Sequence, residues 1–308
     1  MKNTIIIALV VLLLGIGGYL LLTNGSDTSY QDKSPQSNSE IDSENNEQVV
    51  GDIVDQQNDS VVQKPQSVIG KSVEGRDITA YHYGTGETEL LFVGGIHGGY
   101  SWNTSLVAYE MIDYLEKNPN VISQNVKVTV VPTVNPDGLY EVTGKDGKFS
   151  ASDVSGSQNT SARFNANDVD LNRNFDCNWQ SVSKWQSKDV SGGSSAFSEP
   201  ESAAIKNYVE GVNPDAVVVW YSSAGGVFSS SCNNGVLPET ASITNVFADA
   251  SGYKAYEEFD AYEITGDMVN WLASKGIPGI SVLLTNHSST EWSKNKAGIE
   301  ALINYYSN

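Results

Sequence analysis

The stretch Leu91-Phe-Val-Gly-Gly-Ile-His97-Gly-Gly-Tyr-Ser-Trp-Asn-Thr104 passes from an apolar run through two glycines to a histidine, and then into a predicted helix. This order is typical of a strand that ends at a functional site, because open α/β sheets bind ligands in the crevice beyond the carboxyl ends of their strands. A polar turn residue without a ligand is the simpler interpretation of His97. The rest of the chain has to decide between the two interpretations.

Predicted strands and helices alternate on both sides of this stretch. Two short strands are expected within 67–83, and buried or half-buried strands at 90–93, 126–131, 216–221 and 279–284. Helices are expected after a cap at Asn103 or Thr104, and at 200–210 with Ser198 as cap, 238–251, 267–275 and 291–306. A turn at 132–138 and a long surface loop at 144–162 complete the prediction. The pattern predicts a single α/β domain with a mixed, mostly parallel central sheet, helices on both faces, and strand ends that meet at one crevice.

The residues before this domain differ from it in composition. From Thr4 to Leu22 nearly every residue is apolar, which is enough to cross a bilayer at about 1.5 Å per residue. We expect an uncleaved membrane anchor at 1–23, with a cleaved signal peptide and a secreted domain as the alternative. The polar, acidic segment 24–66 is expected to be a disordered linker, and 67–308 the folded domain. Lys2 precedes the apolar stretch, so the positive-inside rule predicts a domain outside the cytoplasm, at the cell surface or in the periplasm.

Charge and cysteine content limit the possible partners and compartment. The formal net charge of −19 argues against nucleic acid and anionic lipid surfaces as partners. Cys177 and Cys232 are the two cysteines, and outside the cytoplasm such a pair is expected to form a disulfide. A zinc site built on them is the weaker alternative, because neither has a second cysteine or a histidine at ligand spacing.

Six short motifs occur in a fixed order between Ile69 and Tyr306. They are Ile69-Gly-Lys-Ser-Val-Glu-Gly-Arg76, Gly94-Gly-Ile-His97-Gly, Asn135-Pro-Asp-Gly138, Val169-Asp-Leu-Asn-Arg-Asn-Phe175, Phe197-Ser-Glu-Pro-Glu201 and Thr265-Gly-Asp-Met-Val-Asn-Trp271. Each motif alone is weak evidence, but in this order they resemble the zinc metallocarboxypeptidases of carboxypeptidase A/B type. The resemblance implies a zinc ion held by His, Glu and His, a glutamate as general base, and an Asn-Arg pair for the carboxylate of the substrate.

The substrate-binding half of that family site is matched in this chain. The resemblance implies that Asn172 and Arg173 are the carboxylate-binding pair and that Tyr262 is the tyrosine of a mobile loop. It also implies that Arg163 is the arginine that stabilises the oxyanion.

The metal-binding half is mostly replaced. His97 matches the first ligand, but the ligand glutamate falls on Tyr100 or Ser101, and the second histidine falls on Ser222. The general base falls on Leu283, or on Leu284 with one residue of slip. The chain has three histidines, and a zinc site rescued by His97 and His287 is the remaining alternative.

Three functions remain open at this stage. The leading hypothesis is a membrane-anchored member of the family that has lost hydrolysis and keeps a pocket for peptide carboxyl termini, including those of cell-wall stem peptides. The second is an active metallocarboxypeptidase with a rearranged zinc site. The third is a structural or adhesion module that uses the fold as a scaffold.

Overall fold

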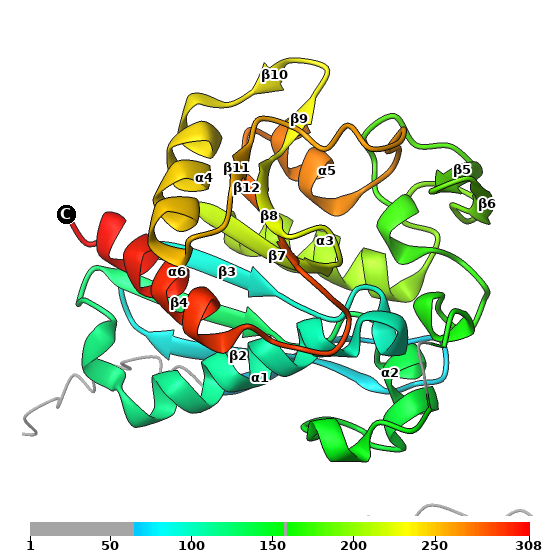
Figure 1. Cartoon of the computed structure of the whole chain (residues 1–308), viewed down its shortest axis with the longest axis horizontal. Coiled ribbons are helices and arrows are strands. Elements are labelled where there is room, and N and C mark those ends of the chain that lie inside the picture. Colours follow the sequence, from blue (N-terminus) through cyan, green and yellow to red (C-terminus); the bar gives the residue numbers. More distant parts are fainter. Residues whose placement is uncertain (1–64, 157–158) are drawn as a thin grey trace, which may run out of the picture. The chain divides into compact units, whose positions relative to one another are not determined.

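A mixed sheet of eight strands runs through the domain in the order β1-β2-β4-β3-β7-β12-β8-β11 (Figure 1). The computed structural model describes residues 65–156 and 159–308, so the predicted anchor at 1–23 and the predicted linker up to residue 64 lie outside the described residues. Within the described ranges, no helix is both long enough and apolar enough to cross a bilayer.

Six of the eight strands follow the predicted positions closely, and the other two, Gly226–Ser229 and Ala255–Tyr256, were not predicted. The eight strands are β1 (Gln66–Lys71), β2 (Asp77–Gly84), β3 (Thr88–Val93), β4 (Val126–Val131), β7 (Ala216–Ser222), β8 (Gly226–Ser229), β11 (Ala255–Tyr256) and β12 (Gly279–Leu284). Two small sheets, which the sequence did not predict, pair β5 (Val182–Trp185) with β6 (Lys188–Ser191) and β9 (Ser231–Cys232) with β10 (Gly235–Val236).

Parallel pairing is concentrated in the centre of the large sheet. β4, β3, β7 and β12 pair parallel to one another, whereas β1 with β2, β2 with β4, and β12 with β8 pair antiparallel. The mixed α/β fold is therefore confirmed. The central strands are buried on both faces, and this explains why they read as continuous apolar runs in the sequence.

Six α-helices accompany the sheet in the described part of the chain. They are α1 (Trp102–Lys117), α2 (Pro136–Thr143), α3 (Pro200–Val212), α4 (Pro238–Ser251), α5 (Met268–Ser274) and α6 (Trp292–Tyr305). Apolar residues of α1, α4 and α6 pack on one face of the sheet, and those of α3 and α5 pack on the other. Two apolar cores thus hold the central strands in place and expose only their ends.

Three local predictions were wrong. Residues 136–138 begin α2 instead of forming an isolated turn, because the Asn135 side chain accepts a hydrogen bond from the backbone N–H of Gly138 and caps the helix. The cap position of α1 is Ser101, which makes no side-chain capping bond. The cap position of α3 is Glu199, and the Ser198 hydroxyl donates to its carboxylate instead.

Candidate functional site

A cleft of about 1100 Å³ opens at the carboxyl ends of the central strands. β3, β7 and β12 are neighbours in the sheet and run parallel, so the segments that follow them meet at one edge. The cleft is lined by most of the residues selected from the sequence, including His97, Arg163, Asn172, Arg173, Ser222, Tyr262 and Leu283. Ser101 and Leu284 do not line it, and both are almost completely buried.

Glycine next to His97 allows two loops to approach each other. Gly98 has a φ of +43°, and a Cβ atom there would lie 2.6 Å from the carbonyl oxygen of Ala162. That contact is too close for any side chain, so the turn after β3 can pack against the segment that carries Arg163 only with glycine at this position. The glycines of the opening motif therefore position the floor of the cleft.

Arg163 is held in the cleft by a buried carboxylate. Its Nε and Nη2 atoms lie 2.9 and 2.8 Å from Oδ2 of Asp170, and both side chains are almost completely buried. Burial opposes ionisation of Asp170, but the charges of Arg163 and Arg173 outweigh it and lower the pKa of this carboxyl to about 2. Trp185 of the β5–β6 hairpin covers the guanidinium at 4.4 Å.

Arg173 and Asn172 lie on a short 3-10 helix, Leu171–Arg173. Nε and Nη1 of Arg173 donate to the backbone carbonyls of Lys184 and Asn172, at 2.9 and 2.6 Å. Oδ1 of Asn172 accepts hydrogen bonds from the Tyr221 hydroxyl and from the backbone N–H of Met268, at 3.1 and 3.2 Å. Both side chains are thus fixed from behind while they line the cleft.

Asp267 is a second buried acid in the cleft wall. Its side chain is 5% exposed, and Oδ1 has no hydrogen-bond partner in the described structure. Burial raises the pKa of this carboxyl to about 6, although the charge of Arg173 acts in the opposite direction. Asp267 precedes α5 within the motif Thr265–Trp271, but its role as a titrating group was not predicted from the sequence.

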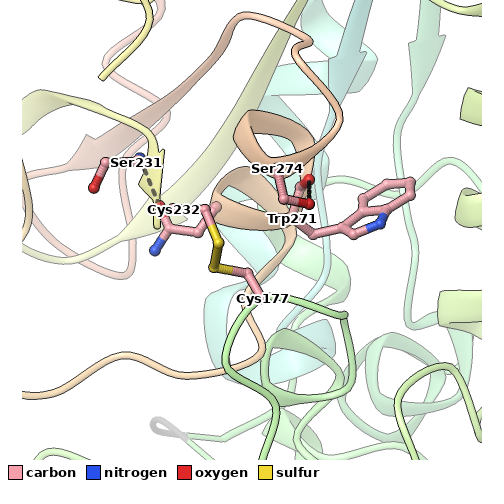
Figure 2. The surroundings of a disulfide bond; sticks show 6 residues. Cys177, Ser231, Cys232, Trp271 and Ser274 are labelled. Carbon is pink, nitrogen blue, oxygen red and sulfur yellow. Dashed lines mark hydrogen bonds between the residues drawn. A yellow bond between two sulfur atoms is a disulfide. The ribbon is translucent and has the colours of Figure 1, made fainter. Parts of the chain in front are cut away.

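The predicted disulfide between Cys177 and Cys232 is confirmed. It connects the segment that follows Arg173 to β9, beside α5 (Figure 2). The backbone N–H of Ser231, next to the disulfide, donates a hydrogen bond to Oδ1 of Asn270 at 2.9 Å. This side of the cleft is therefore anchored by one covalent link and one hydrogen bond.

Tyr262 lies on the segment between β11 and α5 and lines the cleft mouth. Its ring packs edge to face on Phe259 at 5.1 Å and joins an aromatic cluster with Tyr100, Phe164 and Trp185. The structure thus places Tyr262 in the same cleft as Arg173.

The residues at the expected metal positions are poor ligands for zinc. Tyr100 is packed between the Trp185 ring at 5.1 Å and the His287 ring at 4.6 Å. Leu283 lines the cleft with an apolar side chain. At the end of β7, the Ser222 hydroxyl donates to Oδ1 of Asn103 at 3.1 Å. None of these side chains supplies the carboxylate or imidazole that the family site requires.

Of the expected zinc-ligand positions, the first is occupied by a residue that can bind zinc, His97. It is 5% exposed, neither ring nitrogen has a hydrogen-bond partner in the described structure, and Nε2 lies 3.7 Å from Oδ1 of Asp170. Burial and the charge of Arg163 lower its pKa well below the usual value, so the imidazole is neutral. The Tyr221 ring lies 5.6 Å from it, at the end of β7.

These donors do not fit a zinc site of the family type. Within residues 65–156 and 159–308, no three His, Cys, Asp or Glu side chains converge as metal ligands do. A catalytic zinc ion needs three protein ligands, and His97 with Asp170 would supply at most two. Asp170 is, in addition, already paired with Arg163.

The sequence assigned no role to three residues of the site, Asp170, Trp185 and Asp267. Asp170 stands inside the motif Val169–Phe175, and its place in that motif was the available signal for it. Trp185 lies in a hairpin that has no strong strand pattern, so no local signal pointed to it.

Known proteins with similar sequences align with part of the chain. Carboxypeptidase Z of Rattus norvegicus is 34% identical over 120 residues, which is 35% of this chain and 17% of that protein. The catalytic chain of carboxypeptidase N of Homo sapiens is 28% identical over 185 residues, which is 55% of this chain and 37% of that protein. The chain thus matches well under half the length of these relatives.

Solved structures share the fold. Murein-tripeptide amidase MpaA of Escherichia coli O157 superimposes with a TM-score of 0.56 at 21% identity, over 80% of this chain and 92% of that one. Bovine thrombin-activatable fibrinolysis inhibitor, solved with tick carboxypeptidase inhibitor, gives a TM-score of 0.59 at 17% identity, over 79% and 88% of the two chains.

The sequence model of one family covers most of the chain. Residues 54–305 match the family described as zinc carboxypeptidase, and this range contains all six motifs and every residue of the cleft. The chain therefore belongs to the zinc carboxypeptidase family.

Proposed function

We propose that this domain binds the free carboxylate of a peptide carboxyl terminus and does not carry out zinc-dependent hydrolysis. The proposal separates two parts of the family site. Arg163, Asn172, Arg173 and Tyr262 form the part that recognises substrate, and the positions of Tyr100, Ser222 and Leu283 form the part that is replaced.

The state of Arg173 carries the binding half of the proposal. Its side chain is 1% exposed, and its hydrogen bonds go to two backbone carbonyls. Among the described residues, no acid forms an ion pair with it. A buried guanidinium at the wall of a cleft favours an anionic ligand, because a carboxylate can pair with it in a bidentate manner without any metal.

The replaced metal-site positions support the second part of the proposal, the absence of zinc-dependent hydrolysis. An active family member needs a ligand glutamate and a general base, and Tyr100 and Leu283 can perform neither role. The alternative is a rearranged zinc site that uses His97 and His287, which would make the protein an active metallocarboxypeptidase. A structural or adhesion module is the third possibility and requires neither Arg173 nor His97.

Calorimetry with short peptides tests the binding half. We expect a peptide with a free carboxyl terminus to bind at least about tenfold more tightly than its amidated form, a difference of about 1.4 kcal/mol. Arg173→Ala should abolish this preference. Lys275→Ala, which removes one exposed positive charge at the end of α5, should leave it unchanged. Equal affinity for both peptide forms, or a preference that survives Arg173→Ala, contradicts the proposal.

Metal analysis of the purified protein tests the other half. We expect far less than one equivalent of zinc by mass spectrometry, and no release of terminal residues upon addition of zinc. Stoichiometric zinc together with chelator-sensitive release would establish the active enzyme instead. A structural module would bind neither zinc nor either peptide form.

We also propose that the domain acts outside the cytoplasm, held by an anchor at 1–23. The disulfide supports an oxidising compartment, and the apolar stretch Thr4–Leu22 supports the anchor. The name of the E. coli protein with a similar fold refers to murein tripeptide. Stem peptides of the cell wall are therefore, together with peptide carboxyl termini in general, the ligands to test first.

A further inference from the structure

Ser222 and His287 form a polar pair on the wall of the cleft. The Ser222 oxygen Oγ lies 3.3 Å from Nδ1 of His287, and both residues are half-buried and line the cleft. Ser101 approaches the same nitrogen at 3.5 Å, but it is 1% exposed and does not line the cleft. A ligand in the cleft can therefore reach the Ser222 hydroxyl and not that of Ser101.

Asn103 fixes the position of both members of the pair. Its Nδ2 donates to the backbone carbonyls of Asn286 and Ser289, at 2.7 and 2.9 Å, and so ties the loop that carries His287 to the start of α1. These two bonds also orient the amide, so that Oδ1 faces the Ser222 hydroxyl at 3.1 Å. Rotation of the hydroxyl hydrogen alone moves it from Asn103 to His287, without a shift of any heavy atom.

The environment of His287 suits a proton acceptor. Burial and the charge of Arg163 lower its pKa, while a hydrogen bond with the backbone of Tyr100 acts in the opposite direction. The neutral ring that results can accept a proton on Nδ1. The Tyr100 ring, 4.6 Å away, packs against the imidazole and restricts its rotation.

We propose that Ser222 is a nucleophile with His287 as its base, and that the cleft thereby supports metal-independent acyl transfer from esters or activated amides to water. A serine hydroxyl becomes a nucleophile when an adjacent base accepts its proton, and contacts of this kind are often looser before a substrate binds. The proposal is independent of peptide carboxylate binding by Arg173.

The reaction balances with water as the second reactant. As Oγ of Ser222 bonds to the acyl carbon, its proton passes to Nδ1 of His287. The bond to the leaving group then breaks, and the leaving group takes the proton from the imidazolium. Water attacks the acyl-serine ester and gives one proton to His287, which returns it to Oγ as the acid is released. Arg163, which lines the same cleft, supplies positive charge for the oxyanion.

A fluorophosphonate probe tests the nucleophile on the full chain. We expect one probe molecule per protein, and peptide mapping should place it on Ser222 in the presence of a chelator. Ser222→Ala should abolish labelling, and His287→Gln should slow it at least tenfold. Ser187 is an exposed serine that lines the same cleft, and it serves as the control. The Ser187→Ala variant should react with the probe at the wild-type rate.

Hydrolysis of p-nitrophenyl acetate provides a second readout. We expect turnover that Ser222→Ala removes and that chelator does not affect. Absence of label from wild-type protein, label on Ser101 or another residue, or an unchanged labelling rate in His287→Gln overturns the proposal. Turnover that stops with chelator and returns with zinc also overturns it. Mapping on the wild type remains decisive even if a variant fails to fold.

Discussion

At the scale of a single residue, the protonation state of Asp267 should make the affinity of the cleft for carboxylates depend on pH. Its carboxyl has a pKa of about 6, so it is mostly protonated at pH 5 and ionised at pH 8. The ionised form partly neutralises the attraction of Arg173 for a ligand and also repels the ligand's own carboxylate. The cleft should therefore bind anions more weakly as the pH rises through this range.

Calorimetry at pH 5 and pH 8 checks this effect with a peptide that has a free carboxyl terminus. We expect wild-type affinity to fall by roughly fivefold, or about 1 kcal/mol, between the two values. Asp267→Asn should remove the pH dependence, whereas Asp260→Asn, an exposed acid that lines the same cleft, should retain it. A pH dependence that survives in Asp267→Asn would show that another group is responsible.

Asp170 stabilises the fold through its pairing with the buried Arg163. Asp170→Asn leaves the guanidinium without a countercharge, and we expect a loss of about 3–5 kcal/mol in the free energy of unfolding. Urea denaturation at pH 7 measures this loss. Asp189→Asn breaks an ion pair with Lys184 in which both side chains are exposed, and should cost at most about 1 kcal/mol.

The same pair predicts how acid affects the wild-type protein. The pKa of Asp170 is about 2 in the folded state, below its value of about 3.9 in an unfolded chain. Its stabilising contribution is therefore complete above about pH 4 and is lost as the pH falls towards 2. If the two Asp→Asn variants lost equal stability at pH 7, the Arg163–Asp170 pair would not have the role described.

At the scale of elements, the disulfide joins two segments that the sheet does not hold together directly. Cys177 and Cys232 are 55 residues apart, and a cross-link of that span restricts the unfolded chain by up to about 4 kcal/mol. We expect Cys177→Ser with Cys232→Ser to lower the free energy of unfolding by roughly 2–4 kcal/mol. Denaturant unfolding with and without reductant measures this loss of free energy of unfolding. Reductant should destabilise the wild-type protein and leave the stability of the double variant unchanged. A double variant as stable as the oxidised protein would contradict this expectation.

The accuracy of the predicted elements follows from how each is stabilised. The central strands and long helices carry their own apolar pattern, as in β7 and α4, so sequence alone located them. Such a pattern is absent from the β5–β6 hairpin and from the two-residue strand β11. Tertiary contacts, such as the packing of Trp185 on Arg163, stabilise elements of this kind, and these contacts cannot be read from the local sequence. The start of α2 was misread because proline and glycine are common both in turns and in the first turn of helices.

At the scale of the whole molecule, topology explains why distant motifs identified one site. Residues 97, 163, 173 and 222 belong to different segments, yet parallel pairing of β3, β7 and β12 brings the ends of three strands to one edge. The order of the motifs along the chain was therefore enough to predict that their residues meet at one cleft, without any knowledge of the distances between them. The order could not show the Ser222–His287 contact or the protonation of Asp267, because both depend on side-chain packing and burial.

The replacements at Tyr100 and Leu283 have a consequence for electroneutrality. In the family arrangement, two glutamates contribute two negative charges and a zinc ion contributes two positive charges, which sum to zero. Loss of the metal alone would leave two carboxylates that repel an anionic ligand and compete for Arg163 and Arg173. Without both carboxylates, Asp170 and Asp267 are the acids described beside the two arginines, so an anion pocket does not depend on a metal ion.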